Sequence, residues 1–479
     1  MLTYSFVEKG SDSLYEHLYK CLKNDIVRGI LVPGERLPSK RSFAKNLGIS
    51  IITVENAYFQ LMAEGYIYSL PKKGYYVSDV AVDIERGNTT LSSESMELSS
   101  GKSNIRADFT SNQTEPDIFP FSVWSRLMRE ELSDNREALM TNPPSGGVIR
   151  LREAIAEHLK EFQGIHVMSE QIIVGAGTEY LCGLLVQLLG FDKTYAMEEP
   201  GYGKIHKIYK SHGIDCRKVP MDECGVSVSR LNEEDVDVLH ISPAHNYPTG
   251  RVMPIGRRYE VLGWAAQSES RYIIEDSYAS EFRLKGKPIA TMQSIDVAEK
   301  IIYMNTFTKT ISSTIRISYM VLPPHLVDKF YSKMSFYACT VSNFEQYTLA
   351  RFIQEGYFEK HINRMRRYYL GKKNAIIDMI KSGKLNKRCE ILEEDAGLHF
   401  LLKIKTEKSA EDIKKAALRQ GVRISSLDEY YENPPKEAEN TFIINYSFVP
   451  GSELKRAMKK LEEDRKSTRL NSSHLELSR

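Results

Sequence analysis

The chain has 479 residues, more than a single ordinary core accommodates, so we expect two or more domains. Its composition, 42% hydrophobic and 27% charged, is that of a globular protein, and no apolar run approaches the roughly 20 residues that cross a bilayer. The net charge of +2 gives no overall electrostatic case for nucleic acid, and no signal peptide is evident. The six cysteines are scattered without metal-ligand spacing, which is typical of free thiols in a reducing cytoplasm.

The first predicted element is an amphipathic helix over residues 15–28. Leu18, Leu22 and Ile26 fall on one face of that helix, the spacing that buries one stripe of a helix against a core. Gly29 follows directly and is a typical residue for ending a helix.

Two short helices joined by a glycine turn are predicted next. Ser39 and Ser50 each precede a helical stretch and are typical N-cap residues, while Gly48 ends the first of the two helices. This is the pattern of a helix-turn-helix, whose second helix enters the major groove of DNA. Residues 66–77 then predict a two-stranded wing, and its tip residues are Lys72, Lys73 and Gly74.

This segment resembles the winged-helix domain of the GntR family of bacterial regulators over about 65 residues. The matching positions are Leu31-x-Pro-Gly-x-x-Leu-Pro-Ser-x-Arg41, the turn Gly-Ile-Ser-x-x-Thr53-Val, Ala57-Tyr-x-x-Leu61 and Glu64-Gly-Tyr. The resemblance implies that side chains near the turn approach phosphates and bases, and that the wing tip enters the minor groove. The candidate DNA-binding residues are Ser39, Lys40, Arg41, Ser50, Thr53, Lys72, Lys73 and Gly74.

The second helix of this motif departs from the family at its start. Members often carry Arg directly after the turn serine, whereas this chain has Ile51 followed by Ile52. Residues 1–79 hold ten Lys and Arg against eight Asp and Glu, a net charge of only +2. We therefore expect modest DNA affinity for a monomer and a contribution from dimerisation. The alternative is a helical domain that binds protein, in which the basic residues are ordinary solvated charges.

The composition changes after the wing. Residues 80–107 are rich in Ser, Thr, Asn, Gly and Glu with little periodicity, which predicts a linker. From Asp108 onward, short apolar runs alternate with helical or turn segments, which predicts an α/β domain with a largely parallel sheet. The predicted strands include residues 171–174, 236–241, 271–275 and 301–304.

The most informative stretch of this domain follows the predicted strand at 301–304. Lys309 comes after two hydroxyl residues, Thr306 and Thr308, and Arg316 follows seven positions later. Such a lysine can form a Schiff base with an aldehyde cofactor, and the hydroxyls and the arginine can hold the phosphate of that cofactor. Without these neighbours, a surface lysine after a strand would be the simpler interpretation.

Further motifs supply polar or aromatic groups suited to the same cofactor. Gly177 and Thr178 open an apolar helix, and backbone N–H groups at a helix N-terminus bind phosphate. Tyr202 lies on a Pro-Gly turn and can stack on an aromatic ring, and Asn246 lies in a polar loop. Asp276 ends a buried strand, where a carboxylate needs a cationic partner such as a pyridinium nitrogen. Each motif alone is weak, because small residues after strands and surface turns are common.

Together these motifs resemble the fold type I aminotransferases that use pyridoxal 5'-phosphate, over roughly residues 108–464. The resemblance implies that Lys309 forms the Schiff base and that Asp276 pairs with the ring nitrogen. It implies further that Tyr278 hydrogen-bonds the ring oxygen and that Tyr202 stacks on the ring. The implied phosphate site comprises Gly177, Thr178, Thr306, Thr308 and Arg316.

The chain departs from ordinary aminotransferases where a substrate carboxylate is bound. The last predicted strand, residues 441–448, has no Arg, although enzymes of this class usually clamp the carboxylate with one near there. Tyr247 stands where many have Asn, with Asn246 one position earlier, and Lys204 stands where a GABA-responsive relative uses Arg. Lys does not replace a bidentate Arg equivalently. Arg423 is a further candidate clamp.

A GntR-type winged helix joined to an aminotransferase-like domain is the architecture of the MocR-type regulators, which the chain resembles throughout except at its end. The fold class is therefore multidomain, an α+β winged helix-turn-helix followed by an α/β fold type I domain that binds pyridoxal phosphate. The expected segments are the DNA-binding domain 1–79, the linker 80–107, the effector domain 108–464 and a disordered tail or scar at 465–479.

This resemblance implies a bacterial transcription factor of the cytoplasm, associated with the nucleoid when bound to DNA, that acts as a head-to-tail homodimer on a double-stranded operator. Pyridoxal phosphate, or an amino compound forming an external aldimine with it, would modulate operator binding. The chain is then not a physiological enzyme, although a residual transaminase half-reaction is compatible with its residues. Two alternatives stay open, an active aminotransferase with a DNA-binding appendage and a sensor of pyridoxal phosphate that controls vitamin B6 supply.

Overall fold

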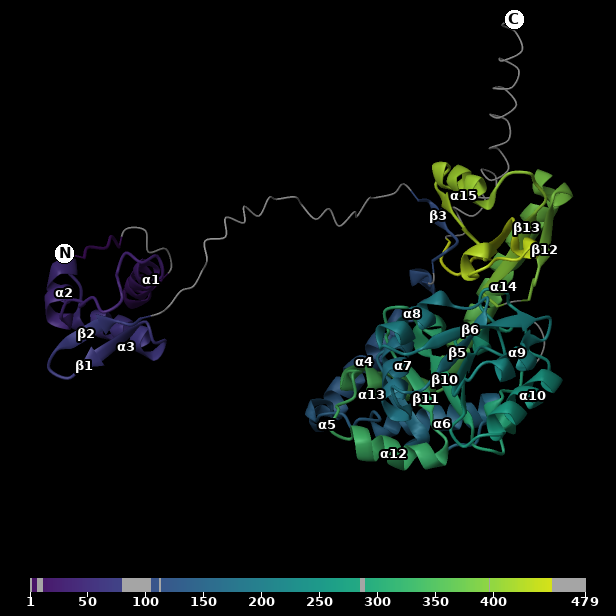
Figure 1. The fold of residues 1–479 in the computed structure, drawn as a ribbon, viewed down its shortest axis with the longest axis horizontal. Helices are drawn as coiled ribbons and strands as arrows, with labels where there is room; N and C mark the ends of the chain where they lie inside the picture. The colour runs from purple at the N-terminus through teal and green to yellow at the C-terminus, as the bar shows by residue number, and fades with distance from the viewer. Residues whose placement is uncertain are drawn as a thin grey trace, which may run out of the picture. The chain divides into compact units, whose positions relative to one another are not determined.

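The chain folds into two compact units (Figure 1). The first unit spans Met1–Gly101 and the second spans Lys102–Arg479. Most of the expected linker 80–107, and all of the expected tail 465–479, lie outside the residues that the structure describes. The described residues of this computed structural model are 2–6, 12–79, 105–111, 113–284, 289–395 and 397–449.

The first unit packs three helices and a hairpin around one apolar core (Figure 1). Its elements are α1 Leu14–Val27, α2 Lys40–Leu47, α3 Ile51–Ala63, β1 Ile67–Leu70 and β2 Gly74–Val77. Leu18, Leu22 and Ile26 of α1 are buried, as their spacing predicted, and they meet Val54 and Leu61 of α3 in the same core. The winged helix-turn-helix predicted from the sequence is therefore confirmed.

Local hydrogen bonds fix the starts of the two short helices. The Ser39 side chain accepts a hydrogen bond from the Ser42 backbone N–H at 3.2 Å, and Ser50 accepts one from Thr53 at 3.0 Å. Each bond satisfies a backbone donor that the first turn of a helix leaves open. Gly48 ends α2 with φ of 66°, a left-handed conformation that glycine adopts without strain. Both helices therefore begin at the serines that the sequence pointed to.

The second unit is built on an eight-stranded sheet. In sheet order its strands are β4 Ile172–Gly175, β11 Ser318–Val321, β10 Ile301–Thr306, β9 Tyr272–Asp276, β8 Val238–Ile241, β5 Tyr195–Glu199, β6 Cys216–Asp222 and β7 Gly225–Val226. Strands β6, β5, β8, β9 and β10 are parallel neighbours, so the prediction of a largely parallel sheet is confirmed. Strand β11 lies antiparallel between β10 and β4, a placement that no sequence pattern had indicated.

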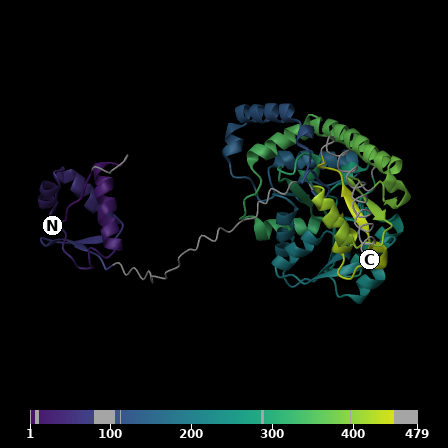
Figure 2. The ribbon, with the colours of Figure 1, turned by 90° about the horizontal axis from the view of Figure 1, so that it is seen from above.

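Helices cover both faces of this sheet. They are α4 Phe121–Asp134, α5 Arg136–Met140, α6 Ile149–Gln163, α7 Thr178–Leu189, α8 Gly203–Ser211, α9 Val228–Glu233, α10 Ile255–Ala266, α12 Pro324–Met334, α13 Asn343–Gln354 and α14 Tyr357–Ser382. Successive residues of a strand point to opposite faces. Tyr303 accordingly packs in a core cluster with residues of α4, α6 and α13, whereas Ile302 and Met304 pack with α7, α8 and α12. Figure 2 shows the long α14 along the outside of the unit.

A separate four-stranded sheet lies in the C-terminal part of the unit. In sheet order its strands are β12 Cys389–Leu392, β13 His399–Ile404, β16 Thr441–Asn445 and β15 Ser425–Ser426, and the helix α15 Ala410–Arg419 belongs to the same region. The last strand predicted from the sequence, at 441–448, is therefore part of this smaller sheet. Across the described residues of both units, no helix is long and apolar enough to cross a membrane.

The beginning of the second unit is fastened to its C-terminal region. Strand β3 Ala107–Asp108 pairs in parallel with β14 Val422–Arg423. The Phe109 backbone N–H donates a hydrogen bond to the Arg423 carbonyl at 2.9 Å, and the Phe109 carbonyl accepts one from Asn445 at 3.3 Å. The Phe109 side chain is fully buried in the apolar cluster beneath the smaller sheet. The start of the second unit is thus hydrogen-bonded to strands near the end of the described chain.

Candidate functional site

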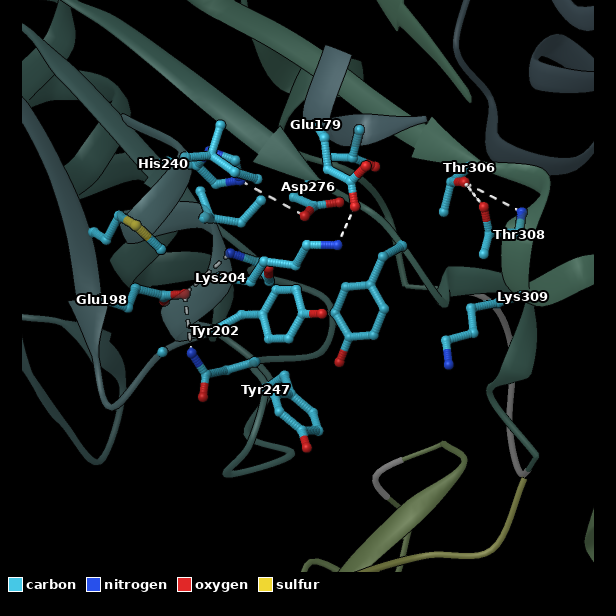
Figure 3. A pocket seen from close by; sticks show the side chains of 18 of the residues that line it. Glu179, Glu198, Tyr202, Lys204, His240, Tyr247, Asp276, Thr306, Thr308 and Lys309 are labelled. Carbon is cyan, nitrogen blue, oxygen red and sulfur yellow. Dashed lines mark hydrogen bonds and ion pairs between the residues drawn. The ribbon is translucent and has the colours of Figure 1, made fainter. Parts of the chain in front are cut away.

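The carboxyl ends of the parallel strands surround a cavity of about 350 Å³ in the second unit (Figure 3). Ligands of open α/β sheets bind at this edge, because loops from several strands converge there. Asp276 is the last residue of β9 and Thr306 the last residue of β10. The structure brings nearly all of the predicted cofactor residues to this cavity, and those that line it are Thr178, Tyr202, Asn246, Asp276, Tyr278, Thr306, Thr308, Lys309 and Arg316.

Lys309 reaches the cavity from α11, a helix of one turn over Phe307–Thr310 that follows β10 directly. Only 9% of the residue is exposed, and this burial lowers the pKa of Lys309 to about 7. A substantial fraction of the amine is therefore uncharged near neutral pH, and the uncharged amine is the form that attacks an aldehyde.

Asp276 and Tyr278 form a polar group on another wall of the cavity. The Asp276 carboxylate lies 3.6 Å from Nε2 of His240, and Nδ1 of the same imidazole is 2.7 Å from the Tyr209 hydroxyl. Burial raises the pKa of Tyr278, so that its phenol stays protonated. Among the described residues no hydrogen bond engages this buried hydroxyl. A buried donor of this kind, on a residue that lines a cavity, is suited to an oxygen of a ligand.

Hydroxyl groups and one arginine occupy the side of the cavity next to Lys309. The Thr306 hydroxyl lies 2.8 Å from that of Thr308, and the Ser318 hydroxyl donates to Thr306 at 2.8 Å. Gly177 precedes α7 with φ of 96°, and a Cβ atom at this position would collide with the Arg316 guanidinium. Gly177 itself does not line the cavity, and its role is to let the backbone and the arginine approach each other.

This arrangement of groups fits pyridoxal 5'-phosphate. The cofactor needs an amine for its aldehyde, an anion for its ring nitrogen, a donor for its ring oxygen and cationic or hydroxyl groups for its phosphate. Lys309, Asp276, Tyr278 and Arg316 supply these four in one cavity. The unpartnered Tyr278 hydroxyl and the close approach of Arg316 to Gly177, which a Cβ atom would prevent, are compatible with such a ligand.

Comparison with known proteins agrees with both halves of this description. Residues 14–77 match the family "Bacterial regulatory proteins, gntR family", and residues 108–461 match "Aminotransferase class I and II". The chain is 35% identical over 454 residues to the uncharacterized HTH-type transcriptional regulator YdeL of Bacillus subtilis, covering 94% of this chain and 96% of that protein. It is 30% identical to the probable rhizopine catabolism regulatory protein MocR of Rhizobium meliloti, covering 94% and 93%. The chain belongs to the MocR-type subgroup of the GntR family of bacterial transcriptional regulators.

Other matches extend the same picture. The regulator is 28% identical to the pyridoxine biosynthesis transcriptional regulator PdxR of Corynebacterium glutamicum, over 88% of its chain and 89% of that protein. Among solved structures, an archaeal alanine:glyoxylate aminotransferase superposes with a TM-score of 0.68 at 22% identity, covering 78% of the regulator and 93% of the enzyme. The kynurenine aminotransferase of Pyrococcus horikoshii gives 0.66 at 21%, covering 77% and 92%. These two likenesses establish the fold of the second unit.

An acidic residue that the sequence interpretation had missed lies among the cations of the regulator's cavity. One oxygen of Glu179 lies 3.0 Å from the Arg316 guanidinium, and the other pairs with Lys204 (Figure 3). Lys204 is the principal cause that holds the pKa of Glu179 below its usual range. The only signal in the sequence was the position of Glu179, next to Thr178, because its partners lie far away along the chain.

A second missed carboxylate orients Asn246. Oε2 of Glu198 accepts hydrogen bonds from the Asn246 side-chain amide and from the Ser242 backbone, each at 3.0 Å. Burial raises the pKa of Glu198. His240 was also missed, although an imidazole inside the apolar run Val238–Ile241 was a signal that could have been followed. The ring of Tyr202 stands edge-on to that of Tyr247, with their centroids 5.7 Å apart.

The remaining predicted residues lie elsewhere. Arg423 pairs with Asp108 at 3.3 Å and does not line the cavity, so it does not act as a carboxylate clamp there. In the first unit, Lys40 pairs with Glu55, while the other candidate DNA-binding residues stand on the surface or cap helices. They are Ser39, Arg41, Ser50, Thr53, Lys72, Lys73 and Gly74.

Proposed function

We propose that this regulator binds pyridoxal 5'-phosphate in the 350 Å³ cavity through a Schiff base with Lys309, and that an amino compound meeting the same site changes its binding to operator DNA. The observation that carries the proposal is the convergence of a buried lysine with Asp276, Tyr278 and Arg316. The chain belongs to a family of DNA-binding regulators with an aminotransferase domain, so the activity that the ligand would control is DNA binding. This proposal needs no catalytic turnover.

Each side chain has a distinct part in this proposal. When bound, the cofactor supplies an aldehyde that reacts reversibly with amines. Burial lowers the pKa of Lys309 to about 7, so that a substantial fraction of this amine is uncharged and available to the aldehyde, and Asp276 keeps a proton on the ring nitrogen. The Tyr278 hydroxyl donates to the ring oxygen, and the Tyr202 ring packs against the heterocycle. Arg316, with the hydroxyls beside it, neutralises the phosphate.

The effector's chemical class follows from the same reaction. An effector must carry a primary amine to displace Lys309 from the cofactor. Ordinary aminotransferase substrates also need a bidentate Arg for their carboxylate, and the last strand, β16, has none. Among the described lining residues, the basic side chains apart from Lys309 are Lys204, Arg316 and His240. We therefore propose that the effector is an amino compound that the site does not bind in the way an aminotransferase binds the carboxylate of a common α-amino acid.

Signal transfer requires two states of the protein with different effector affinity. A ligand shifts an equilibrium only by its differential affinity for the two states. We propose a head-to-tail homodimer, acting in the bacterial cytoplasm on chromosomal operators with repeated half-sites. Two winged helices on one operator would compensate for the modest charge of the first unit.

The direct test measures DNA binding and cofactor state together. A DNA fragment selected by the full-length protein is titrated with the cofactor-free protein, with the cofactor-loaded protein and with the loaded protein plus a panel of amines. We expect at least one cofactor-loaded state to differ from the cofactor-free protein in DNA affinity or footprint. We expect Lys309→Ala to bind DNA with an affinity that neither cofactor nor amine changes. Identical binding in every state would overturn the proposal.

The rival function, an aminotransferase with a DNA-binding appendage, has its own measurement. Steady-state turnover with amino donors and keto acids should be absent or far below ordinary enzyme rates of roughly 1–1000 per second. Sustained turnover in that range would favour the enzyme. A switch in DNA binding by cofactor alone, without any amine, would instead favour a sensor of pyridoxal phosphate.

A further inference from the structure

The solvent face of α3, the second helix of the helix-turn-helix, carries three large exposed apolar side chains. Ile52 and Phe59 are each 67% exposed and Ile51 is 46% exposed. The opposite face already fills the core of the unit, through buried residues that include Val54 and Leu61. The exposed apolar side chains are therefore not part of the core of the unit, and an exposed apolar patch often marks a contact site.

The helix also lacks the side chains that most often read guanine. Residues 51–63 contain no Lys, Arg or His, and Arg and Lys make the commonest specific contacts to guanine. Glu55, the one acidic residue of α3, pairs with Lys40 of α2 at 2.5 Å, so its charge is compensated. Asn56 is exposed one helical turn after Ile52, on the same side of the helix. An asparagine in this position matches adenine, which it can contact through two hydrogen bonds.

The surroundings of this face favour DNA as its partner. Lys40 contacts Glu55 and lies 5.8 Å from the Tyr75 ring centroid, so α2, α3 and the hairpin adjoin each other (Figure 1). The exposed basic residues of the unit include Arg41 of α2 and Lys72 and Lys73 of the hairpin tip. A helix with an apolar start that adjoins elements carrying basic residues complements a DNA groove, whose bases are flanked by phosphates.

We propose that α3 reads a half-site core of A·T pairs, with Ile51 and Ile52 against the C5-methyl groups of thymine and Asn56 bonded to adenine. Residues of the first turn of a recognition helix are those that reach base edges, and apolar side chains discriminate thymine by its methyl group. The inference rests on the DNA binding in the proposed function and adds the base composition that this chain selects.

The test starts from a randomised DNA library selected with the full-length protein. The enriched half-site should hold A·T pairs at its core. Each core thymidine is then replaced by deoxyuridine, which removes only the methyl group. Binding should weaken by about fourfold for each methyl that an isoleucine covers, the value expected for one buried methyl group. A G·C core, or equal affinity for thymidine and deoxyuridine, would overturn the inference while the proposed function stands.

Two variants connect the effect to the helix. Ile52→Ala should bind the thymidine site more weakly than wild type and should lose sensitivity to at least one deoxyuridine substitution. Ile30→Ala is the matched control, because Ile30 is 61% exposed and lies outside α3. If Ile52→Ala keeps full sensitivity to deoxyuridine, or alters only the oligomeric state, the face binds protein and the inference is wrong. A selection that enriches no sequence would remove the DNA-binding basis of both proposals.

Discussion

The two units differ in how far their functional groups are buried. In the second unit Lys309 and Asp276 are each 9% exposed, and carboxylates, hydroxyls and rings surround them. In the first unit most of the candidate DNA-contacting residues are exposed, among them Arg41, Lys72 and Ile52, and 67% of Ile52 is exposed. Burial shifts protonation and fixes geometry, whereas exposed groups contribute through charge and shape at the moment of contact. Single substitutions should therefore have large effects in the cavity and graded effects on the DNA-binding surface.

The largest expected effect is on covalent attachment of the cofactor. Lys309→Ala should lose the visible absorption of the Schiff base and the adduct that borohydride reduces, while it keeps DNA binding. Lys300→Ala is the control, because Lys300 stands at the opposite end of β10 and bonds to the Ser268 and Glu269 carbonyls. A reducible adduct that persists in Lys309→Ala, detected by mass spectrometry, would assign the reaction to another lysine.

The next effect separates phosphate binding from ring binding. Arg316→Ala should weaken the affinity for pyridoxal 5'-phosphate by about 10- to 100-fold, because a charged hydrogen bond to the phosphate is removed. The affinity for pyridoxal, which has no phosphate, should not change. Arg423→Ala, outside the cavity, serves as the matched control. Equal losses for both ligands in a fluorescence titration would contradict the phosphate role of Arg316.

A smaller effect concerns stability and its dependence on pH. The pKa of Lys309 is lowered to about 7 in the folded chain, against about 10.4 for an unfolded lysine. Between these values the unfolded chain binds a proton that the folded chain does not, so this position contributes more stability as pH rises. Without cofactor, Lys309→Met should raise the free energy of unfolding by up to about 4 kcal/mol at pH 7, because the cost of deprotonating the buried amine is removed.

This stabilisation should shrink as the pH approaches 10, because the unfolded wild type then also loses its proton. Urea unfolding of the two cofactor-free proteins at both pH values measures the difference. A difference that stays constant would show that packing of the methionine, and not the buried amine, is its cause.

The smallest effects belong to the DNA-binding surface. Arg41→Ala and Lys72→Ala should each weaken binding and reduce the slope of log affinity against log salt concentration by about 1. Lys20→Ala is the control, since Lys20 pairs with Asp12 on the side of α1. Unchanged slopes in mobility titrations would remove these two residues from the phosphate contacts. A collapse of binding in either single variant would contradict the contrast between the two units.

Sequence patterns predicted the structural features that depend on residues close together in the chain. Ser39 and Ser50 cap their helices by bonds that reach only three residues onward, so the helix starts were visible in the sequence. Lys309 and Asp276 were found because Asp276 ends one apolar strand and Lys309 comes three residues after another, and parallel strands bring such ends together.

Contacts between distant segments were not predictable in the same way. Glu179 and Arg316 are 137 positions apart, and only the finished sheet brings them together. The antiparallel position of β11 was missed for the same reason, since its pairing with β4 leaves no local mark in either strand. The smaller sheet assembles β12, β13, β15 and β16, between which helical and irregular segments intervene.

The pairing of β3 with β14 has a mechanical consequence. Backbone hydrogen bonds attach Ala107, Asp108 and Phe109, at the start of the second unit, to the region of the smaller sheet and not to the eight-stranded sheet. If a ligand in the cavity rotates the smaller sheet, residues 107–109 move with that sheet. The point at which the chain enters the second unit would then be displaced by the same movement.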